Sequence, residues 1–126
     1  MSKAKVTVFF IKRPEDDAPL VYFDATMFPN DDSIDKAIQA GLYEKAAVVS
    51  FDVRQPDAEM VWTTIQNLDE PWTKSPNVEV ITTFPRSMMV GDIIYDHDAD
   101  AWAFVASFGF EPVWQESSID KLTELL

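Results

Sequence analysis

The spacing of apolar residues divides the chain into segments with strand and helix periodicity. Short β-branched and aromatic runs predict six strands, which cover residues 6–11, 20–28, 46–53, 78–83, 88–95 and 101–108. The first run is apolar throughout, so we expect a strand that is buried on both faces of a sheet. The last two runs flank Asp96-His97-Asp98-Ala99-Asp100, whose turn residues predict a hairpin.

Three further segments have helical periodicity. Their apolar faces consist of Ile34, Ala37, Ile38 and Leu42; of Met60, Val61, Ile65 and Leu68; and of Ile119, Leu122 and Leu125. Residues 30–33 offer N-caps for the first helix, and Gly41 is its expected C-terminal stop. Pro56 suits the first turn of the second helix, and Ser117 or Ser118 is the expected N-cap of the third. The order, roughly β-β-α-β-α-β-β-β-α, predicts the α+β class with a mainly antiparallel sheet and two or three short helices packed on it.

The composition indicates a hydrophobic core and an acidic surface. The chain has 126 residues, of which 47% are hydrophobic and 13% aromatic, so residues 1–126 are expected to fold as a single acidic domain. Acids outnumber bases 22 to 10, which gives a formal net charge of −12. This balance argues against direct binding of nucleic acid and against an anionic membrane surface. With no expected membrane span or secretory signal, the predicted location is cytoplasmic.

Few residues suit catalysis or metal binding. The chain has no Cys, and His97 is its single His, whose acidic neighbours are expected to raise its pKa. The D-x-D-x-D spacing that opens a calcium loop occurs at Asp96, Asp98 and Asp100. Ala101 and Ser107 stand where that loop needs Gly and Glu, so a solvated acidic turn is favoured over a metal site. We therefore expect no enzyme activity, no metal and no cofactor.

Four tryptophans are a high number for this length. Trp62 and Trp102 fall inside expected elements and are predicted to pack in the core. Trp72 and Trp114 lie in connections, where each would cap the core from outside or anchor an interface.

The acids are distributed unevenly. Between Ser87 and Asp120 the chain has seven acids, the last of them Asp120, and no Lys or Arg. The simple interpretation is a solubilising surface, and the sharper one is a surface that competes for a basic, nucleic-acid-binding groove on a partner. As a mimic of DNA this surface would be short, because seven carboxylates match the phosphate charges along only about 12 Å of duplex. The expected partner-binding face consists of Asp92, Asp96, Asp98, Asp100, Glu111 and Glu116.

The second half of the chain resembles a known family. Arg86-Ser87-Met88-Met89-Val90-Gly91-Asp92, with Gly109-Phe110-Glu111 downstream, resembles an R-S-x-S-V-G-D signature that ends in G-F. Upstream, Thr64-Ile65-Gln66-Asn67, Trp72 and Asn77-Val78 are similar to a T-x-N … W … N-x-V stretch. Over residues 59–113 the chain thus resembles small, mostly uncharacterised proteins of bacteriophages and mobile elements, and its second half resembles YodL-like accessory domains. Met89 departs from the pattern, which usually has a small hydroxyl residue there.

Two interpretations of the signature are open. In the first, its polar groups form a buried hydrogen-bond network that ties a loop to the hairpin. In the second, they form a recognition site for a partner. The residues concerned are Gln66, Asn67, Trp72, Arg86, Ser87, Gly91 and Asp92.

The resemblance implies a phage-type accessory protein, made in the cytoplasm of the host cell. Together with the charge, it predicts a non-enzymatic protein that binds and modulates a host or phage protein with a basic surface. Homo-oligomerisation stays open. The alternatives are a minor virion or assembly protein and a small metal-dependent hydrolase.

Overall fold

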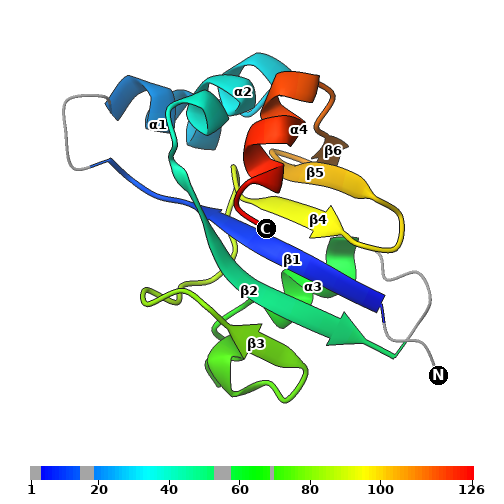
Figure 1. Ribbon diagram of the computed structural model, residues 1–126. Helices are drawn as coiled ribbons and strands as arrows, with labels where there is room; N and C mark the ends of the chain where they lie inside the picture. Colours follow the sequence, from blue (N-terminus) through cyan, green and yellow to red (C-terminus); the bar gives the residue numbers. More distant parts are fainter. Residues whose placement is uncertain (1–3, 15–18, 53–57, 69) are drawn as a thin grey trace.

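The computed structural model describes residues 4–14, 19–52, 58–68 and 70–126, which form an antiparallel sheet with helices on both faces (Figure 1). The strands are β1 (Ala4–Ile11), β2 (Tyr43–Phe51), β3 (Val78–Val80), β4 (Ile93–Asp96), β5 (Ala101–Ala106) and β6 (Gly109–Pro112). The helices are α1 (Pro19–Met27), α2 (Asp31–Gln39), α3 (Ala58–Thr64) and α4 (Glu116–Thr123), with a 3-10 turn η1 (Trp72–Lys74). The strand order is β3-β2-β1-β4-β5-β6, and each neighbouring pair is antiparallel. The expected α+β class with an antiparallel sheet is confirmed.

β1 lies inside the sheet and is buried on both faces, as its apolar sequence predicts. Phe9 and Ile11 pack into the core beneath α1, α2 and α4. Val6, Val8 and Phe10 pack into a second core with residues of α3 and η1. The sheet therefore separates two hydrophobic cores, and β1 contributes to each of them (Figure 1).

The prediction of a strand over residues 20–28 is wrong, because this segment forms α1. Its β-branched and aromatic residues favour extended structure locally, but such preferences yield to packing. Ala25 is fully buried in the core that α1 shares with α2, and the hydroxyl of Thr26 donates to the Tyr22 carbonyl within the helix. Apolar residues of α1 lie on both its exposed and its buried sides, so the sequence shows no helical periodicity there.

α2 confirms its predicted ends. Asn30 is the N-cap: its side chain accepts a hydrogen bond from the Ser33 N–H, and the Ser33 hydroxyl accepts one from the Asn30 N–H. Gly41 has φ of +73°, a left-handed conformation that ends the helix with little strain. Local sequence therefore determines both ends of this helix.

The C-terminal helix begins differently from its prediction. Gln115 is the N-cap of α4, and neither Ser117 nor Ser118 has that role. Ser118 lies within the helix, is 1% exposed, and donates a short hydrogen bond to Asp35 of α2. This serine therefore joins two helices.

The remaining elements are shorter than predicted or were missed. Residues 88–92 precede β4 instead of belonging to it, and β6 is a strand that the sequence pattern did not predict. In α3, Val61 and Ile65 are buried as expected. Met60, within α3, is exposed, and Leu68 is exposed because it lies beyond the end of α3 at Thr64. Pro56 lies outside the described residues.

Candidate functional site

Arg86 and Asp92 form the centre of a hydrogen-bond network at the end of β1. The guanidinium donates two parallel hydrogen bonds, of 2.7 and 2.8 Å, to the two carboxylate oxygens of Asp92. It also donates to the carbonyls of Ile11, at 2.8 Å, and Ser87, at 3.0 Å. The carboxylate accepts further hydrogen bonds from the backbone N–H groups of Ile11, at 2.9 Å, and Met89, at 2.8 Å. Because position 89 contributes its backbone, the methionine there leaves this hydrogen bond intact.

Trp72 extends the network to η1. Its indole N–H donates to the Arg86 carbonyl at 2.7 Å, and its backbone N–H donates to the Asn67 side-chain oxygen at 3.2 Å. The backbone N–H of Asn67 donates to the Ser87 hydroxyl at 2.8 Å. The Gln66 side chain adds a hydrogen bond of 3.3 Å to a carbonyl of the same loop. The loop before β4 is thus tied to η1 and to the segment that follows α3.

Gly91 allows the chain to pass close to α1. Its φ is +96°, and a Cβ atom there would lie 3.1 Å from the Ala25 carbonyl oxygen. The Tyr43 hydroxyl donates to the Gly91 carbonyl at 2.6 Å, and the Gly91 N–H donates to the Val105 carbonyl at 2.9 Å. Only a glycine combines this backbone conformation with this approach.

Burial shapes the ionisation of two groups in the network. It raises the pKa of the Asp92 carboxyl, while the hydrogen bond and charge of Arg86 and the N–H groups of Met89 and Ile11 act in the opposite direction. Burial also raises the pKa of Tyr43 well above its usual value, and the nearby Asp92 adds to this effect. Tyr43 therefore stays protonated and serves as a fixed hydrogen-bond donor.

The structure brings the signature residues together in one hydrogen-bond network. This is the arrangement expected if they have a structural role. The members are Gln66, Asn67, Trp72, Arg86, Ser87, Gly91 and Asp92. Asp92 is 0% exposed and Trp72 is 1% exposed, so neither presents a side chain to a partner. The placement of Asp92 on an acidic binding face is wrong, because its carboxylate is enclosed by Arg86 and backbone N–H groups.

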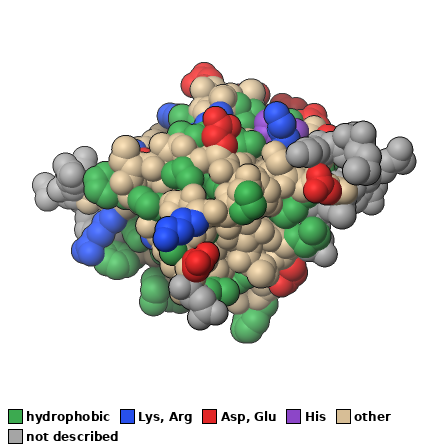
Figure 2. Space-filling view, turned by 90° about the horizontal axis from the view of Figure 1, so that it is seen from below, with side chains coloured by type: hydrophobic (Ala, Val, Ile, Leu, Met, Phe, Trp, Pro, Cys, Tyr) green, Lys and Arg blue, Asp and Glu red, His purple; other side chains and the backbone are tan. Residues whose placement is uncertain are grey.

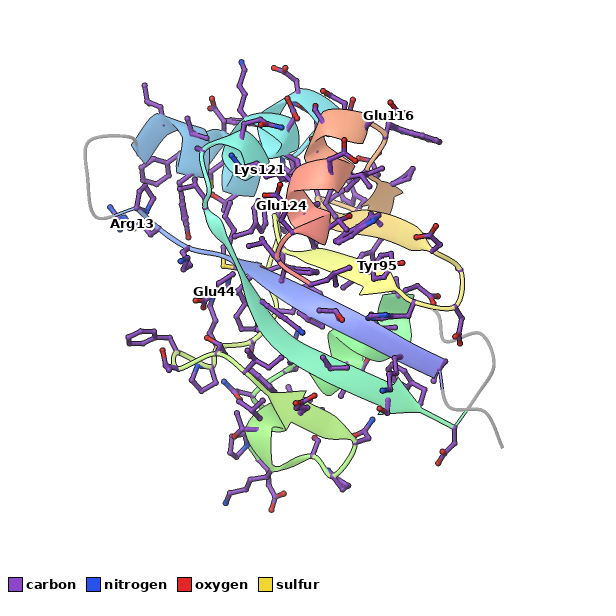
Figure 3. The ribbon with its side chains drawn as sticks, viewed as in Figure 1. Arg13, Glu44, Tyr95, Glu116, Lys121 and Glu124 are labelled. Carbon is purple, nitrogen blue, oxygen red and sulfur yellow. The ribbon has the colours of Figure 1, made fainter. Side chains whose placement is uncertain are left out.

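Arg86 also lines an open cleft of about 670 Å³ beside α1. The lining residues are Phe10, Ile11, Lys12, Arg13, Tyr22, Glu44, Thr83, Phe84, Pro85 and Arg86. The Arg86 guanidinium lies 4.2 Å from the centre of the Phe10 ring, which gives the cleft a flat cationic and aromatic wall. Figure 3 shows Arg13 and Glu44 on this side of the molecule. No local sequence pattern indicates this cleft, because its residues come from four separate segments of the chain.

The three aspartates of the β4–β5 hairpin fold onto their own turn. The Asp96 carboxylate accepts the N–H groups of Asp98, at 3.0 Å, and Ala99, at 3.2 Å. The Asp100 carboxylate accepts the Tyr95 hydroxyl at 2.7 Å. Among the described residues, no group of three or more His, Cys, Asp or Glu side chains could hold a metal ion.

The connection between β6 and α4 presents an exposed aromatic side chain among acids. Trp114 is 72% exposed, and Glu111 and Glu116 on either side of it are exposed as well. The neighbouring Val113 is 7% exposed and its N–H donates to the Trp102 carbonyl at 3.0 Å. The sequence left core capping and interface anchoring open for Trp114, and its exposure excludes the first.

The prediction for His97 is wrong in sign. Its pKa is lowered by burial first and then by the nearby charges of Lys5 and Lys45, which outweigh Asp96 and Asp98. The ring Nε2 lies 2.6 Å from the Thr7 hydroxyl oxygen. The sequence shows the two acids beside the histidine but cannot show the two lysines that the sheet brings near.

Charge of both signs is mixed on the face opposite α2 and α4. Figure 2 shows Lys and Arg side chains beside Asp and Glu there, with hydrophobic side chains scattered between them. The excess of acidic residues is therefore not concentrated on this face.

These features define a small α+β protein with a six-stranded antiparallel sheet, one tightly bonded loop and one cleft that contains cations and aromatic rings. No family model, no curated protein and no solved structure matches the chain. In the part of the chain that is described, no helix has the length and apolarity needed to cross a membrane.

Proposed function

We propose that this chain is a non-enzymatic binding protein that attaches to a basic surface of another protein. The binding surface is an acidic edge, which consists of Asp96, Asp98, Asp100, Glu111 and Glu116 together with Trp114. Its acids lie on the β4–β5 hairpin, on β6 beside β5, and at the start of α4. The resemblance of residues 59–113 to phage and mobile-element proteins favours an accessory protein that modulates a host or phage target.

The exposure of Trp114 carries this proposal. Trp114 is 72% exposed between two exposed glutamates, and tryptophan is enriched among the residues that dominate protein interfaces. Exposed carboxylates on both sides of it would steer a basic partner and set its orientation. Burial of the indole would then supply affinity, and the charges would supply association rate.

A nucleic-acid-binding protein is the favoured target class. Its groove offers closely spaced Lys and Arg side chains, which carboxylates can occupy in place of phosphates. The acidic edge can form only a few ionic contacts, so we expect it to block a small basic site and not a long nucleic-acid groove.

The test is affinity capture from a lysate of the cells in which the chain is made, at low salt, followed by mass spectrometry. A protein that the original chain retains should be lost with Trp114→Ala and with Glu111→Lys combined with Glu116→Lys. Phe108→Ala is the matched control, because Phe108 is 99% exposed but lies in the β5–β6 turn. The retained protein should also lose its nucleic acid when the original chain is added. If the same proteins bind all variants equally, the proposal is wrong.

A further inference from the structure

The cleft beside α1 and the segment around Trp114 have complementary chemistry. We propose that the cleft binds residues 111–116 of a second copy of this chain, with the Trp114 side chain inserted into it. The inference rests on the two surfaces themselves and does not require the proposed function.

The cleft can receive an indole. Its lining includes Tyr22 and the 80% exposed Phe84, together with Phe10 and Ile11, which are almost fully buried. Its volume of about 670 Å³ is within the range of pockets that enclose small ligands. Because Phe84 is exposed, its ring can pack against an inserted aromatic ring.

The cleft also offers cations in an acidic protein. Lys12, Arg13 and Arg86 are three of the ten bases of the sequence, and all three line this one cleft. Arg86 is ion-paired with Asp92, so it contributes a fixed planar wall, while Lys12 and Arg13 are exposed at the end of β1. Among the described lining residues Glu44 is the single acid, and it accepts a hydrogen bond from Thr82 at 2.8 Å.

The inserted segment is held in place from both sides. Val113 is buried and bonded to the Trp102 carbonyl, and the Gln115 side chain donates to Asp31 of α2 at 3.3 Å. Trp114 is therefore presented by a backbone that loses little freedom on binding, which favours association. Glu111 and Glu116 flank it, and their carboxylates match the charge of the two exposed bases at the cleft.

The two surfaces lie on different sides of one molecule. Figure 3 shows Arg13 beside α1 and Glu116 at the opposite end of the helical layer. One copy cannot fill its own cleft, so the contact is head-to-tail, and repetition of it yields open chains or a closed ring. Each junction would also cover Trp114, so self-association and binding of a basic partner would compete.

The net charge of −12 opposes self-association through long-range repulsion. At physiological ionic strength the Debye length is about 8 Å, so most of this repulsion is screened while contacts inside the cleft persist. The association should therefore be measured at that ionic strength and at high protein concentration.

Sedimentation velocity of the full chain, from about 10 μM to about 1 mM protein, is the first measurement. The mean mass should rise with concentration for the original chain and for the control variant Phe108→Ala. Trp114→Ala, and separately Lys12→Glu combined with Arg13→Glu, should each remain monomeric with unchanged circular dichroism. A monomeric original chain at every concentration would overturn the inference, as would association of Trp114→Ala equal to that of the original chain.

A mixture of the two monomeric variants gives a sharper result. The Trp114→Ala variant keeps its cleft, and the variant with Lys12→Glu and Arg13→Glu keeps its tryptophan. Together they can form a single intact junction, so a one-to-one dimer and no larger species is expected. A mixture that stays monomeric contradicts the inference. Neither result bears on capture of a basic partner, so the two proposals fail separately.

Discussion

Arg86 holds the buried carboxylate of Asp92 through two parallel hydrogen bonds, and both residues also bond to the backbone of Ile11. The pair therefore fixes the loop before β4 against the end of β1. The same guanidinium lies over the Phe10 ring, and Arg86 also lines the cleft. The shape of the cleft thus depends on an ion pair whose carboxylate is fully buried and whose guanidinium lines the cleft.

Asp92→Asn is expected to lower the free energy of unfolding by about 2–4 kcal/mol, because it leaves Arg86 without its counter-charge. The loss is below that of a fully enclosed pair, since the Arg86 side chain is 32% exposed. Urea denaturation measures it. Asp98→Asn, on the exposed hairpin, should change stability by about 0.5 kcal/mol or less. Equal losses for the two variants would show that the ion pair does not stabilise the fold.

Gly91→Ala is expected to destabilise the protein more than Gly109→Ala. Both glycines have positive φ, +96° and +92°, so alanine costs roughly 1–2 kcal/mol at either position. Only at Gly91 would the new Cβ also meet a backbone atom, the Ala25 carbonyl oxygen at 3.1 Å. Thermal unfolding of the two variants isolates this contact, and a smaller loss at Gly91 would contradict it.

Trp72→Phe is expected to cost about 1–3 kcal/mol, because it leaves the Arg86 carbonyl without its indole donor and removes part of a buried ring. Trp114→Phe is the matched change at a residue that is 72% exposed, and its effect on stability should be small. Urea denaturation followed by circular dichroism compares them. A comparable loss at both positions would mean that Trp72 is not the structural tryptophan.

His97 is expected to titrate below its usual pKa of 6.5. A histidine with a lowered pKa in the folded state binds fewer protons than in the unfolded state, so its contribution to stability is present above pH 6.5 and is lost as the pH falls. NMR titration of the ring signals gives the midpoint directly. Lys5→Gln should raise that midpoint, because the positive charge of Lys5 lowers the pKa of His97, whereas Lys74→Gln in η1 should leave it unchanged. A midpoint above 6.5 in the original chain would contradict this assignment.

The hydrogen bonds expected among the signature residues are present, whereas the placement of Asp92 on the acidic face is wrong. In the sequence, Gln66, Asn67 and Arg86 near a tryptophan indicated a hydrogen-bond network, and the structure contains these hydrogen bonds. The acidic block suggested that Asp92 lies on a face, but a carboxylate looks the same in sequence whether solvent or Arg86 surrounds it. The exposure of Trp114 was equally invisible, since it depends on how β6 and α4 meet.

The sequence by itself determined the features that arise within a few residues: the doubly buried β1, the β4–β5 hairpin, and the ends of α2 at Asn30 and Gly41. Periodicity, caps and turn residues act locally, so they can be recognised in a single chain. Only the tertiary structure decided that residues 19–27 form a helix. It alone placed Asp92 in the interior and assembled a cleft from β1, α1, β2 and the segment before β4. These outcomes depend on contacts between distant segments, which change burial and charge environment without changing any local pattern.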